Sequence, residues 1–430
     1  MSAKNIFRTF EHLPLKIGDI DEEYGSAFEE KHFNALVKFH GNGSAYFSLL
    51  HRGIKFTQFV GVLQVGNLTI EVLPKTDKGD ENKTLWHGFL VDMFKQSGII
   101  DVKTSGFSSL RTKSNSILDI YFGLFINEVR YLLYTGLIKK YRKTEGDLNA
   151  LKGSILFPKH LSKNLTHAEQ FYVRYTTYDR DNLFNQLLYK TIKHIRKINT
   201  SPALHSNIEN LLLDFPECKD ILVSDSVFSK IIFDRKSEGY KRAISMSRMI
   251  LLNYFPDIRQ GENDVLALMF DMNKLWENYI FKKLHKELTK DRIYYIKGQK
   301  NVQIGFWEPD GGRTRKIIPD IVVYKNDGSN MPVVIFDTKW KNLSGNKATD
   351  DDLKQMFVYN LNYATTESAL VYPANEHSKV SGEYVNDDRF GNCSLIQLPL
   401  VKKDGKMELE LDVLMDFIQE LVDVKLASAH

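Results

Sequence analysis

The sequence predicts an α+β protein of several domains, in which a β-rich region, a mainly helical region and a mixed α/β region follow one another. Short β-branched and aromatic runs separated by glycines occupy residues 44–74, and helical patterns dominate residues 115–250. Residues 266–373 alternate helix, strands, helix and strand. Because 430 residues exceed one ordinary hydrophobic core, we expect three domains, at residues 1–108, 109–265 and 266–430.

The composition is typical of a soluble globular protein, with 43% hydrophobic and 26% charged residues. Two cysteines, Cys218 and Cys393, lie far apart, which excludes a disulfide framework and favours a reducing cytoplasm. Residues 1–19 lack the apolar stretch of a signal peptide, and no apolar run reaches transmembrane length. We therefore expect a cytoplasmic protein with no membrane partner.

Positive charge is concentrated in the middle of the chain. Residues 101–200 hold 17 Lys and Arg against 8 Asp and Glu, a local net charge of +9, whereas the whole chain carries +4. A predicted helix over residues 115–143 ends in the basic cluster Lys139, Lys140, Arg142 and Lys143. Such a cluster suits DNA phosphates. An ordinary solvated helical face explains the charge equally well.

Several elements flank this basic segment. Residues 68–73 alternate like a half-buried strand, and a helix is expected at about 82–96, before a domain boundary near residue 108. A second helix is predicted over residues 181–198, followed by further helices to about residue 250.

The C-terminal region reads as a mixed sheet flanked by helices. Helices are predicted at 266–288 and 351–364, and strands at 292–297, 301–307, 316–324, 332–340 and 368–373. A turn at residues 326–329 joins the strands over 316–324 and 332–340.

Charged residues interrupt two of these apolar strands. Asp337 and Lys339 share one face of the strand 332–340, and both of its faces are mainly apolar. Buried charges are costly unless they are paired or bind a ligand. A hairpin brings Asp320 beside Asp337, and two adjacent carboxylates repel unless a cation lies between them. Hard oxygen ligands suit Mg²⁺ or Mn²⁺.

This set of residues predicts phosphodiester hydrolysis. Asp320, Asp337 and the Thr338 carbonyl would hold the metal, and Lys339 would orient or deprotonate the attacking water. In the alternative interpretation, Asp320 is a turn residue and Asp337–Lys339 is a surface ion pair on an edge strand. The surrounding hydrophobic residues argue against that alternative.

Predicted helices add further candidates to this site. Glu277 lies in an apolar setting and suits a second metal ligand, although a salt bridge to Lys274 or Lys282 explains it equally well. Gln355 and Tyr359 lie one helical turn apart, where they would hold a metal-bound water or a phosphate of the DNA. A capping or packing role is the alternative for both.

Other chemistries lack support in the sequence. No G-x-x-x-x-G-K-[ST] segment occurs, so the chain is not expected to hydrolyse nucleoside triphosphates by itself. No H-E-x-x-H or paired-cysteine spacing indicates zinc.

The site residues resemble the PD-(D/E)xK nuclease superfamily, nearest to its RecB-like branch: Asp320, Asp337-x-Lys339, the Glu277 helix and Gln355-xxx-Tyr359. The run from Gly61 to Lys75 resembles the N-terminal signature of the McrC family, the nuclease subunits of McrBC modification-dependent (5-methylcytosine) restriction systems.

Further matches to the McrC family lie in the middle of the chain: Gly136-Leu137, Tyr141, Glu145 with Leu148, and the run from Tyr178 to Asn182 with Asn185. The resemblance extends over roughly residues 55 to 370. One departure is Lys152-Gly153-Ser154, where the family usually shows Arg-Gly-Arg, so a role for the second arginine is in doubt here.

The resemblance implies a restriction-endonuclease-like domain and Mg²⁺-dependent cleavage of modified duplex DNA, with no small-molecule substrate. It also implies a separate AAA+ GTPase subunit of the McrB type, which reads the modification and is stimulated by this chain. On this view a hairpin over residues 61–75 projects into the ring of that partner, with Gly66 and Lys75 as contacts. The alternative is a core hairpin in which Gly66 serves the turn.

Two other functions stay open at this stage. One is a non-catalytic activator and scaffold of the AAA+ motor with a degenerate nuclease domain, and the other is a free-standing DNA nuclease. The intact Asp/Asp/Lys set favours an enzyme. A neighbouring gene for an AAA+ GTPase would favour the restriction complex.

Overall fold

A computed structural model describes most of the chain, namely residues 5–41, 43–75, 82–99, 116–167, 169–255, 264–290, 293–299, 302–308, 314–328, 331–343, 347–363, 365–385, 391–403 and 406–427. The chain divides into two compact units. The larger unit comprises Ile6–Leu63, Ile70–Lys103 and Met269–His430, and the smaller unit comprises Met1–Asn5, Gln64–Thr69 and Thr104–Leu268. No helix among the described residues is long and apolar enough to cross a membrane.

These two units differ from the three consecutive domains that the sequence predicts. Most of the predicted regions 1–108 and 266–430 fall together in the larger unit, and most of the region 109–265 falls in the smaller unit. The domain boundary predicted near residue 108 lies outside the described residues.

The N-terminal part of the chain forms the elements β1 (Ile6–Phe10), β2 (Pro14–Lys16), α1 (Glu30–His40), β3 (Phe47–Leu50), β4 (Gly53–Phe56), β5 (Phe59–Val65), β6 (Leu68–Leu73) and α2 (Lys83–Gln96). The predicted β structure over 44–74 and the helix at 82–96 are thereby confirmed. Strands β2, β4 and β3 form one antiparallel sheet, and β6 lies between β1 and β5 in another.

Strand β6 is buried on both faces, so the predicted half-buried strand is wrong. The alternation of Thr69 and Glu71 with apolar residues suggested a solvent face. Glu71 instead lies inside the larger unit, where its Oε2 is 2.8 Å from Nε of the equally buried Arg8 and 3.7 Å from Nε2 of His87. An internal ion pair replaces water at this polar position.

The smaller unit is mainly helical, with α3 (Ile117–Thr135), α5 (Leu183–Ile198), α6 (Pro202–Asp214), α7 (Asp225–Ser229), a short 3₁₀ turn (Glu238–Tyr240) and α8 (Lys241–Leu252), followed by β10 (Tyr254–Phe255). The helix predicted over 181–198 and the helices up to residue 250 are confirmed. Apolar side chains such as Leu187 and Ile208 form the core between these helices.

The basic cluster does not end a helix, contrary to the sequence-based prediction. Helix α3 stops at Thr135 because Gly136 takes a φ of 93°, which residues with a Cβ rarely adopt. The chain then forms β7 (Lys140–Leu148), β8 (Ser154–Ile155), α4 (Phe157–Asn164) and β9 (Phe171–Asp179).

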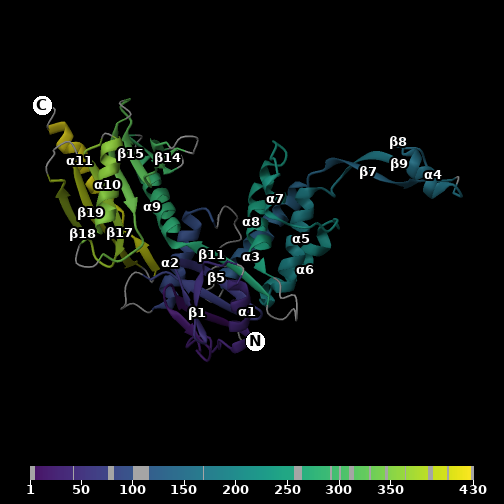
Figure 1. The fold of residues 1–430 in the computed structure, drawn as a ribbon, viewed down its shortest axis with the longest axis horizontal. Coiled ribbons are helices and arrows are strands. Elements are labelled where there is room, and N and C mark those ends of the chain that lie inside the picture. Colours follow the sequence, from purple (N-terminus) through teal and green to yellow (C-terminus); the bar gives the residue numbers. More distant parts are fainter. Residues whose placement is uncertain are drawn as a thin grey trace. The chain divides into compact units, whose positions relative to one another are not determined.

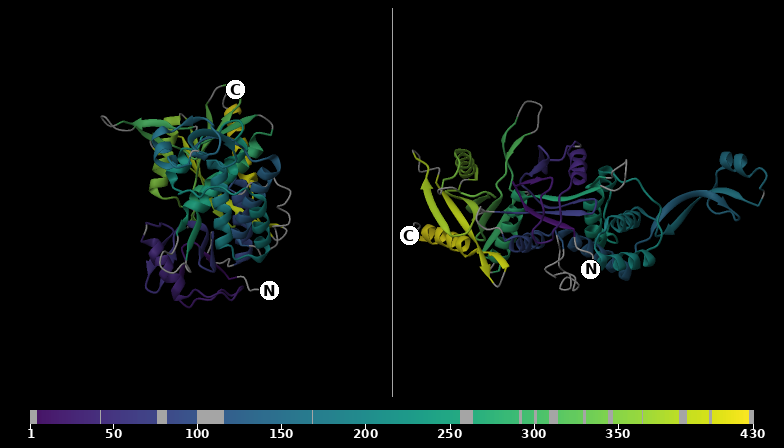
Figure 2. Two further views of the ribbon diagram at one scale, coloured as in Figure 1. Left: turned by 90° about the vertical axis from the view of Figure 1, so that its right-hand side faces the viewer. Right: turned by 90° about the horizontal axis from the view of Figure 1, so that it is seen from below.

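Strands β7 and β9 form a ribbon that extends away from the helices of the smaller unit (Figures 1 and 2). They pair antiparallel from Lys140↔Asp179 to Leu148↔Phe171, and α4 lies at the far end. At the near end, the side-chain amides of Asn182 and Asn185 both donate to the Ile138 carbonyl. The ribbon is thus fixed to the helices by hydrogen bonds at its base.

The C-terminal region begins differently from the prediction of a helix at 266–288. Residues 265–271 form strand β11 (Val265–Asp271), and helix α9 (Met272–Leu288) starts after Asp271, whose carboxylate accepts from the backbone N–H groups of Asn273 and Lys274. A short apolar run such as 265–269 suits a buried strand or a buried helix equally, so only the capping aspartate marks the boundary.

The elements after α9 are β12 (Tyr294–Gly298), β13 (Ile304–Trp307), β14 (Arg315–Ile317), β15 (Ile321–Lys325), β16 (Pro332–Thr338), α10 (Asp350–Tyr363), β17 (Glu367–Ala374), β18 (Ser378–Glu383), β19 (Asn392–Lys403), β20 (Lys406–Leu409) and α11 (Asp412–Ala427). Seven of these strands form a mixed sheet in the order β12-β15-β16-β17-β19-β18, with β20 paired to β19. Strands β16, β17 and β19 run parallel to one another.

The predicted sheet and the helix at 351–364 are confirmed, with one strand divided. The run 316–324 forms β14 and β15, and Pro319 and Asp320 lie between them. Strands β13 and β14 pair with each other outside the main sheet. The predicted turn at 326–329 lies partly outside the described residues, but the hairpin of β15 and β16 is present.

Helices cover both faces of this sheet. Met356 and Tyr359 of α10 pack with Ile335 and Leu370 on one face. Phe336 points to the opposite face, where its ring lies 6.3 Å from that of Phe417 on α11. Strand β16 is therefore covered on both sides, as its apolar sequence predicts.

The buried pair in the larger unit gives a first testable prediction. Replacing Glu71 by alanine leaves the Arg8 guanidinium without its buried partner, and we expect the free energy of unfolding to fall by about 3–5 kcal/mol. Urea unfolding of the variant measures this loss. The control is Asp351→Ala, which removes an exposed pair to Lys354 and should change stability by less than about 0.5 kcal/mol. Equal losses in both variants would contradict the role of Glu71.

Candidate active site

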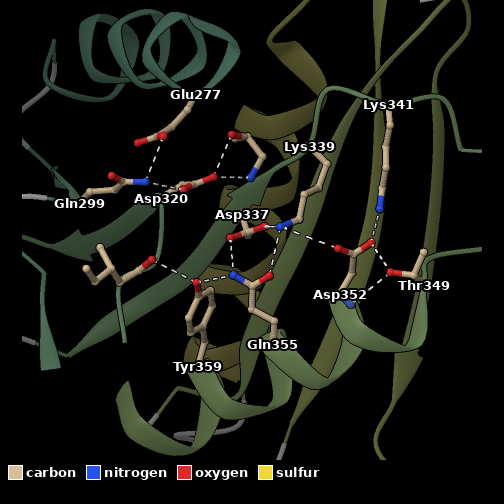
Figure 3. Close-up of polar contacts among 12 residues, drawn as sticks. Glu277, Gln299, Asp320, Asp337, Lys339, Lys341, Thr349, Asp352, Gln355 and Tyr359 are labelled. Carbon is tan, nitrogen blue, oxygen red and sulfur yellow. Dashed lines mark hydrogen bonds and ion pairs between the residues drawn. The ribbon is translucent and has the colours of Figure 1, made fainter. Parts of the chain in front are cut away.

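Two aspartates meet where β15 begins and β16 ends (Figure 3). Ile321 pairs with Phe336, so the residue before Ile321, Asp320, lies next to Asp337. Asp320 Oδ2 accepts from the Thr338 backbone N–H at 2.8 Å and from its hydroxyl at 2.9 Å. The predicted approach of Asp320 to Asp337 is thereby confirmed, although Asp320 precedes its strand instead of lying within it.

Asp337 and Lys339 form an ion pair inside the protein. Asp337 is only 2% exposed, and Lys339 Nζ lies 2.6 Å from its Oδ2. Strand β16 has β15 on one side and β17 on the other, and the pairing with β17 continues in a hydrogen bond from Lys339 N to Val371 O. The alternative of a surface ion pair on an edge strand is therefore wrong.

Glu277 reaches the aspartates from helix α9 through a bridging amide (Figure 3). The Gln299 Nε2 group donates to Glu277 Oε2 and to Asp320 Oδ1, at 3.0 Å in each case. Sequence reasoning missed Gln299. The available signal was its place directly after β12, because Gly298 pairs with Ile321 and so brings residue 299 beside residue 320.

Each carboxylate of this site makes the ionisation of its neighbours less favourable. Burial, together with the charges of Asp320 and Asp337, raises the pKa of Glu277 to about 8. Burial and the charge of Asp320 raise the pKa of Asp337 to about 6, against the opposing effect of Lys339. Three carboxylates thus lie near one lysine, and their mutual repulsion opposes full ionisation of the group.

Gln355 and Tyr359 hold the ion pair from helix α10. Gln355 Oε1 accepts from Lys339 Nζ at 3.0 Å, and its Nε2 donates to Asp337 Oδ1 at 3.2 Å and to the Tyr359 hydroxyl at 2.6 Å. Tyr359 is 4% exposed and donates to the Ile318 carbonyl. Its predicted contact with DNA does not fit this burial, and Tyr359 instead supports Gln355.

A second group of charges adjoins Lys339. Asp352 of α10 lies with its Oδ1 3.7 Å from Lys339 Nζ, and its Oδ2 contacts Lys341 Nζ at 2.5 Å and the Thr349 hydroxyl at 2.7 Å. Sequence reasoning did not single out these residues. Acidic residues are favourable at any helix N-terminus, so the three at the start of α10 carry no specific signal in the sequence.

The donor set fits a hard cation when backbone oxygen is included. Among the described residues no group of three or more His, Cys, Asp or Glu side chains is arranged to hold a metal. Asp320 and Asp337 nevertheless lie side by side, and the set predicted from the sequence adds the Thr338 carbonyl. The Gln299 amide already places a positive dipole between Asp320 and Glu277. Carboxylates with carbonyl oxygen and water are the ligands that Mg²⁺ prefers.

Comparison with known proteins assigns the family. The family model described as McrBC 5-methylcytosine restriction system component matches residues 54–373, which is more than half of the chain. The chain belongs to this McrBC family. No curated protein matches the chain.

A solved structure shares the fold. The refined half-complex from the tetradecameric assembly of Thermococcus gammatolerans McrB AAA+ hexamers with bound McrC contains a chain that aligns with a TM-score of 0.68 and 18% identity. That alignment covers 97% of this chain and 100% of the other. A chain of the cryo-EM structure of the Thermococcus gammatolerans McrBC complex gives 0.49 at 18% identity, covering 66% of this chain and 88% of that one.

Several residues that carry the McrBC resemblance hold the ribbon of the smaller unit. Arg142 on β7 pairs with Asp179 and Asp181, and Glu145 binds Arg174 on β9. Gly153 takes a φ of 78°, and a Cβ there would lie 2.2 Å from the Arg174 carbonyl oxygen. The backbone conformation thus requires glycine at position 153, in the segment Lys152-Gly153-Ser154 that departs from the family pattern.

Four of the predicted DNA contacts, Lys139, Lys140, Arg142 and Lys143, lie at the base of this ribbon. Lys140 pairs with Asp234, and Arg142 is occupied by its aspartates. The side chains of Lys139 and Lys143 are exposed. Of the predicted cluster, these two lysines have the exposure that a phosphate contact needs.

The predicted partner contacts Gly66 and Lys75 lie in different units. Strands β5 and β6 are buried and do not project, so the alternative of a core hairpin is confirmed, with Gly66 at a φ of 58° in its turn. Lys75 donates its backbone N–H to Glu11 Oε1, which also accepts from Trp340 Nε1 at 2.7 Å. Contact of Gly66 or Lys75 with a partner stays a prediction.

The raised pKa of Glu277 predicts a pH dependence of stability without divalent metal. The folded protein holds a proton on Glu277 up to about pH 8, whereas the unfolded chain releases it near 4.5, so stability falls as pH rises between these values. Wild type should therefore lose melting temperature relative to Glu277→Gln from pH 5 to pH 8. Thermal melting in EDTA measures this difference, with the exposed Asp351→Asn as control. A difference that stays constant with pH would contradict the coupling of these carboxylates.

Proposed function

We propose that this chain is the nuclease subunit of a McrBC restriction complex and cleaves modified duplex DNA with Mg²⁺. It acts together with a separate AAA+ GTPase subunit of the McrB type and stimulates that partner. The observation that carries the proposal is the convergence of Asp320, Asp337 and Lys339, joined by Glu277 and Gln355, at one end of the mixed sheet.

Mg²⁺, or Mn²⁺ in its place, would be held by Asp320, Asp337 and the Thr338 carbonyl, with Glu277 as a further ligand. When bound, the ion supplies positive charge against the charge that develops on the scissile phosphate and favours ionisation of the attacking water. The raised pKa values of Glu277 and Asp337 support this assignment, because nearby carboxylates that repel one another gain from a cation.

Lys339 supplies the positive charge that belongs to the protein itself. Burial works against its ammonium, but Asp337 and Asp352 outweigh that effect and raise its pKa, so the side chain stays charged. Held by Asp337 and Gln355, Lys339 Nζ is placed to orient the attacking water and to stabilise charge on the phosphate. Gln355 fixes this geometry and is itself fixed by Tyr359.

The ribbon of the smaller unit has two surfaces suited to partners. Lys139 and Lys143 at its base are exposed cations that suit DNA phosphates. At its far end, Phe157, Leu161 and Leu165 are 64%, 59% and 80% exposed, and an apolar group of this kind suits a protein partner. We propose that the base contacts DNA and that the far end contacts the AAA+ subunit.

The nuclease assignment predicts that Asp337→Ala and Lys339→Ala lower cleavage by at least about a hundredfold, since the first removes a metal ligand and the second removes the positive charge beside the scissile phosphate. Both variants should stay folded. The measurement is Mg²⁺-dependent cleavage of methylated duplex DNA, with and without the GTPase partner and GTP, beside thermal melting. Lys354→Ala, an exposed lysine of α10, is the control. Undiminished cleavage by both variants would leave only the activator role.

The roles proposed for the two ends of the ribbon predict that each of two double variants changes one property, either DNA binding or partner GTP turnover. Lys139→Gln with Lys143→Gln should reduce the slope of log affinity against log salt by about 2, because roughly one counterion is released per phosphate contact. Phe157→Ser with Leu161→Ser should lower partner GTP turnover and leave that slope unchanged. DNA binding across a salt series and GTP turnover are measured on both full-length variants. The assignment fails if each variant matches wild type in both measurements.

A further inference from the structure

The ammonium of Lys339 has other acceptors around it besides its ion-pair partner Asp337. Asp337 Oδ2 lies at 2.6 Å, Gln355 Oε1 at 3.0 Å and Asp352 Oδ1 at 3.7 Å (Figure 3). Asp337 and Gln355 belong to the predicted catalytic set, but Asp352 has no place in it. A long, flexible lysine side chain needs several fixed acceptors to stay in one position.

Asp352 is itself held firmly. Its side chain is 11% exposed, and its Oδ2 accepts from Lys341 Nζ and the Thr349 hydroxyl at 2.5 and 2.7 Å. Thr349 Oγ1 in turn accepts from the Asp352 backbone N–H at 3.3 Å. One carboxylate oxygen is therefore fixed at the start of α10, which leaves the other, Oδ1, directed at Lys339.

Stabilisation of the helix N-terminus accounts for only one oxygen of Asp352, because the contacts with Thr349 at the start of α10 engage Oδ2 and leave Oδ1 toward Lys339. Asp350 and Asp351 lie in the same first turn of α10 and serve the helix dipole equally well. Asp351 is 96% exposed and its nearest cation is Lys354, at 3.9 Å. Of these three acids, Asp352 is the one that is buried and lies against the lysines that follow β16.

We propose that Asp352 is a positioning residue that holds the ammonium of Lys339 beside Asp337 for the attack of water on the phosphate. The proposal rests on the nuclease function proposed above. In this role Asp352 is a ligand of neither the substrate nor the metal. It acts through Lys339, as a second anionic acceptor on the side away from Asp337. Lys341, which shares Asp352, fixes the carboxylate in the orientation that this requires.

Asp352→Asn keeps the size of the side chain and removes its charge. We expect the single-turnover cleavage rate at saturating DNA and Mg²⁺ to fall by about 10–100-fold, as for other supporting residues of metal sites. The dissociation constant for DNA, measured in Ca²⁺, should stay within about twofold, since a positioning residue affects the reacting geometry more than uniform binding. Asp352→Glu, which restores the charge, should regain part of the rate.

Two neighbouring acids provide matched controls. Asp350→Asn and Asp351→Asn remove the same charge from the same helical turn and should cleave like wild type. Thermal melting of all variants separates positioning from folding. If Asp352→Asn loses DNA binding and melting temperature in proportion to its rate, or if Asp352→Glu regains nothing, the residue is structural and the proposal fails.

The two proposals fail in distinguishable ways. If Lys339→Ala and Asp337→Ala cleave like wild type, the nuclease function itself is wrong, whatever Asp352 does. If Lys339→Ala abolishes cleavage while Asp352→Asn matches Asp351→Asn, the nuclease function stands and the positioning role is wrong.

Discussion

A carboxylate buried on a central strand is the constraint on which the site depends. Asp337 is 2% exposed, and β16 has a strand on each side and helices on both faces. Water cannot solvate this charge, so the protein must supply the compensation. Lys339 and the Gln355 amide supply part of it, and the repulsion from Asp320 works against it. The uncompensated part of this charge is the basis of the divalent cation proposed for this position.

The N-terminal strands contribute to the same end of the sheet, within the larger unit. The Glu11 carboxylate, whose pKa burial raises to about 7, accepts from the Lys75 backbone and from the indole of Trp340. Trp340 directly follows Lys339 and packs edge-on against Trp276, at 5.2 Å, beside Glu277 on α9. A cut near residue 265 would separate Glu11 from Trp340, so residues 266–430 alone lack some of the contacts beside the site.

Helices and strands were predicted correctly from the sequence wherever the apolar pattern pointed to a single type of secondary structure. The apolar strands 332–340 and 368–373 and the helix at 351–364 are present because burial and helical spacing agree there. Errors arose where local signals conflicted. Residues 265–271 suit a strand or a helix, and only the cap at Asp271 decides. In the middle region, the backbone freedom of Gly136 ended a helix that periodicity alone extended to residue 143.

Within the site, the charged residues in or beside apolar strands were predictable from the sequence, whereas the polar residues that contact them were not. Asp320, Asp337 and Lys339 stand out because buried charge is costly, but Gln299 and Asp352 are ordinary polar residues at element ends. Their roles depend on which strands pair and on where α10 begins, and no single segment contains that information. Gln299 lies beside Asp320 only because β12 pairs with β15, and Asp352 reaches Lys339 only because α10 packs on β16. These residues thus become parts of the site only through the packing of strands and helices that are distant in the sequence. The contacts of Lys339 with Asp337 and Asp352 link α10 to the end of β16.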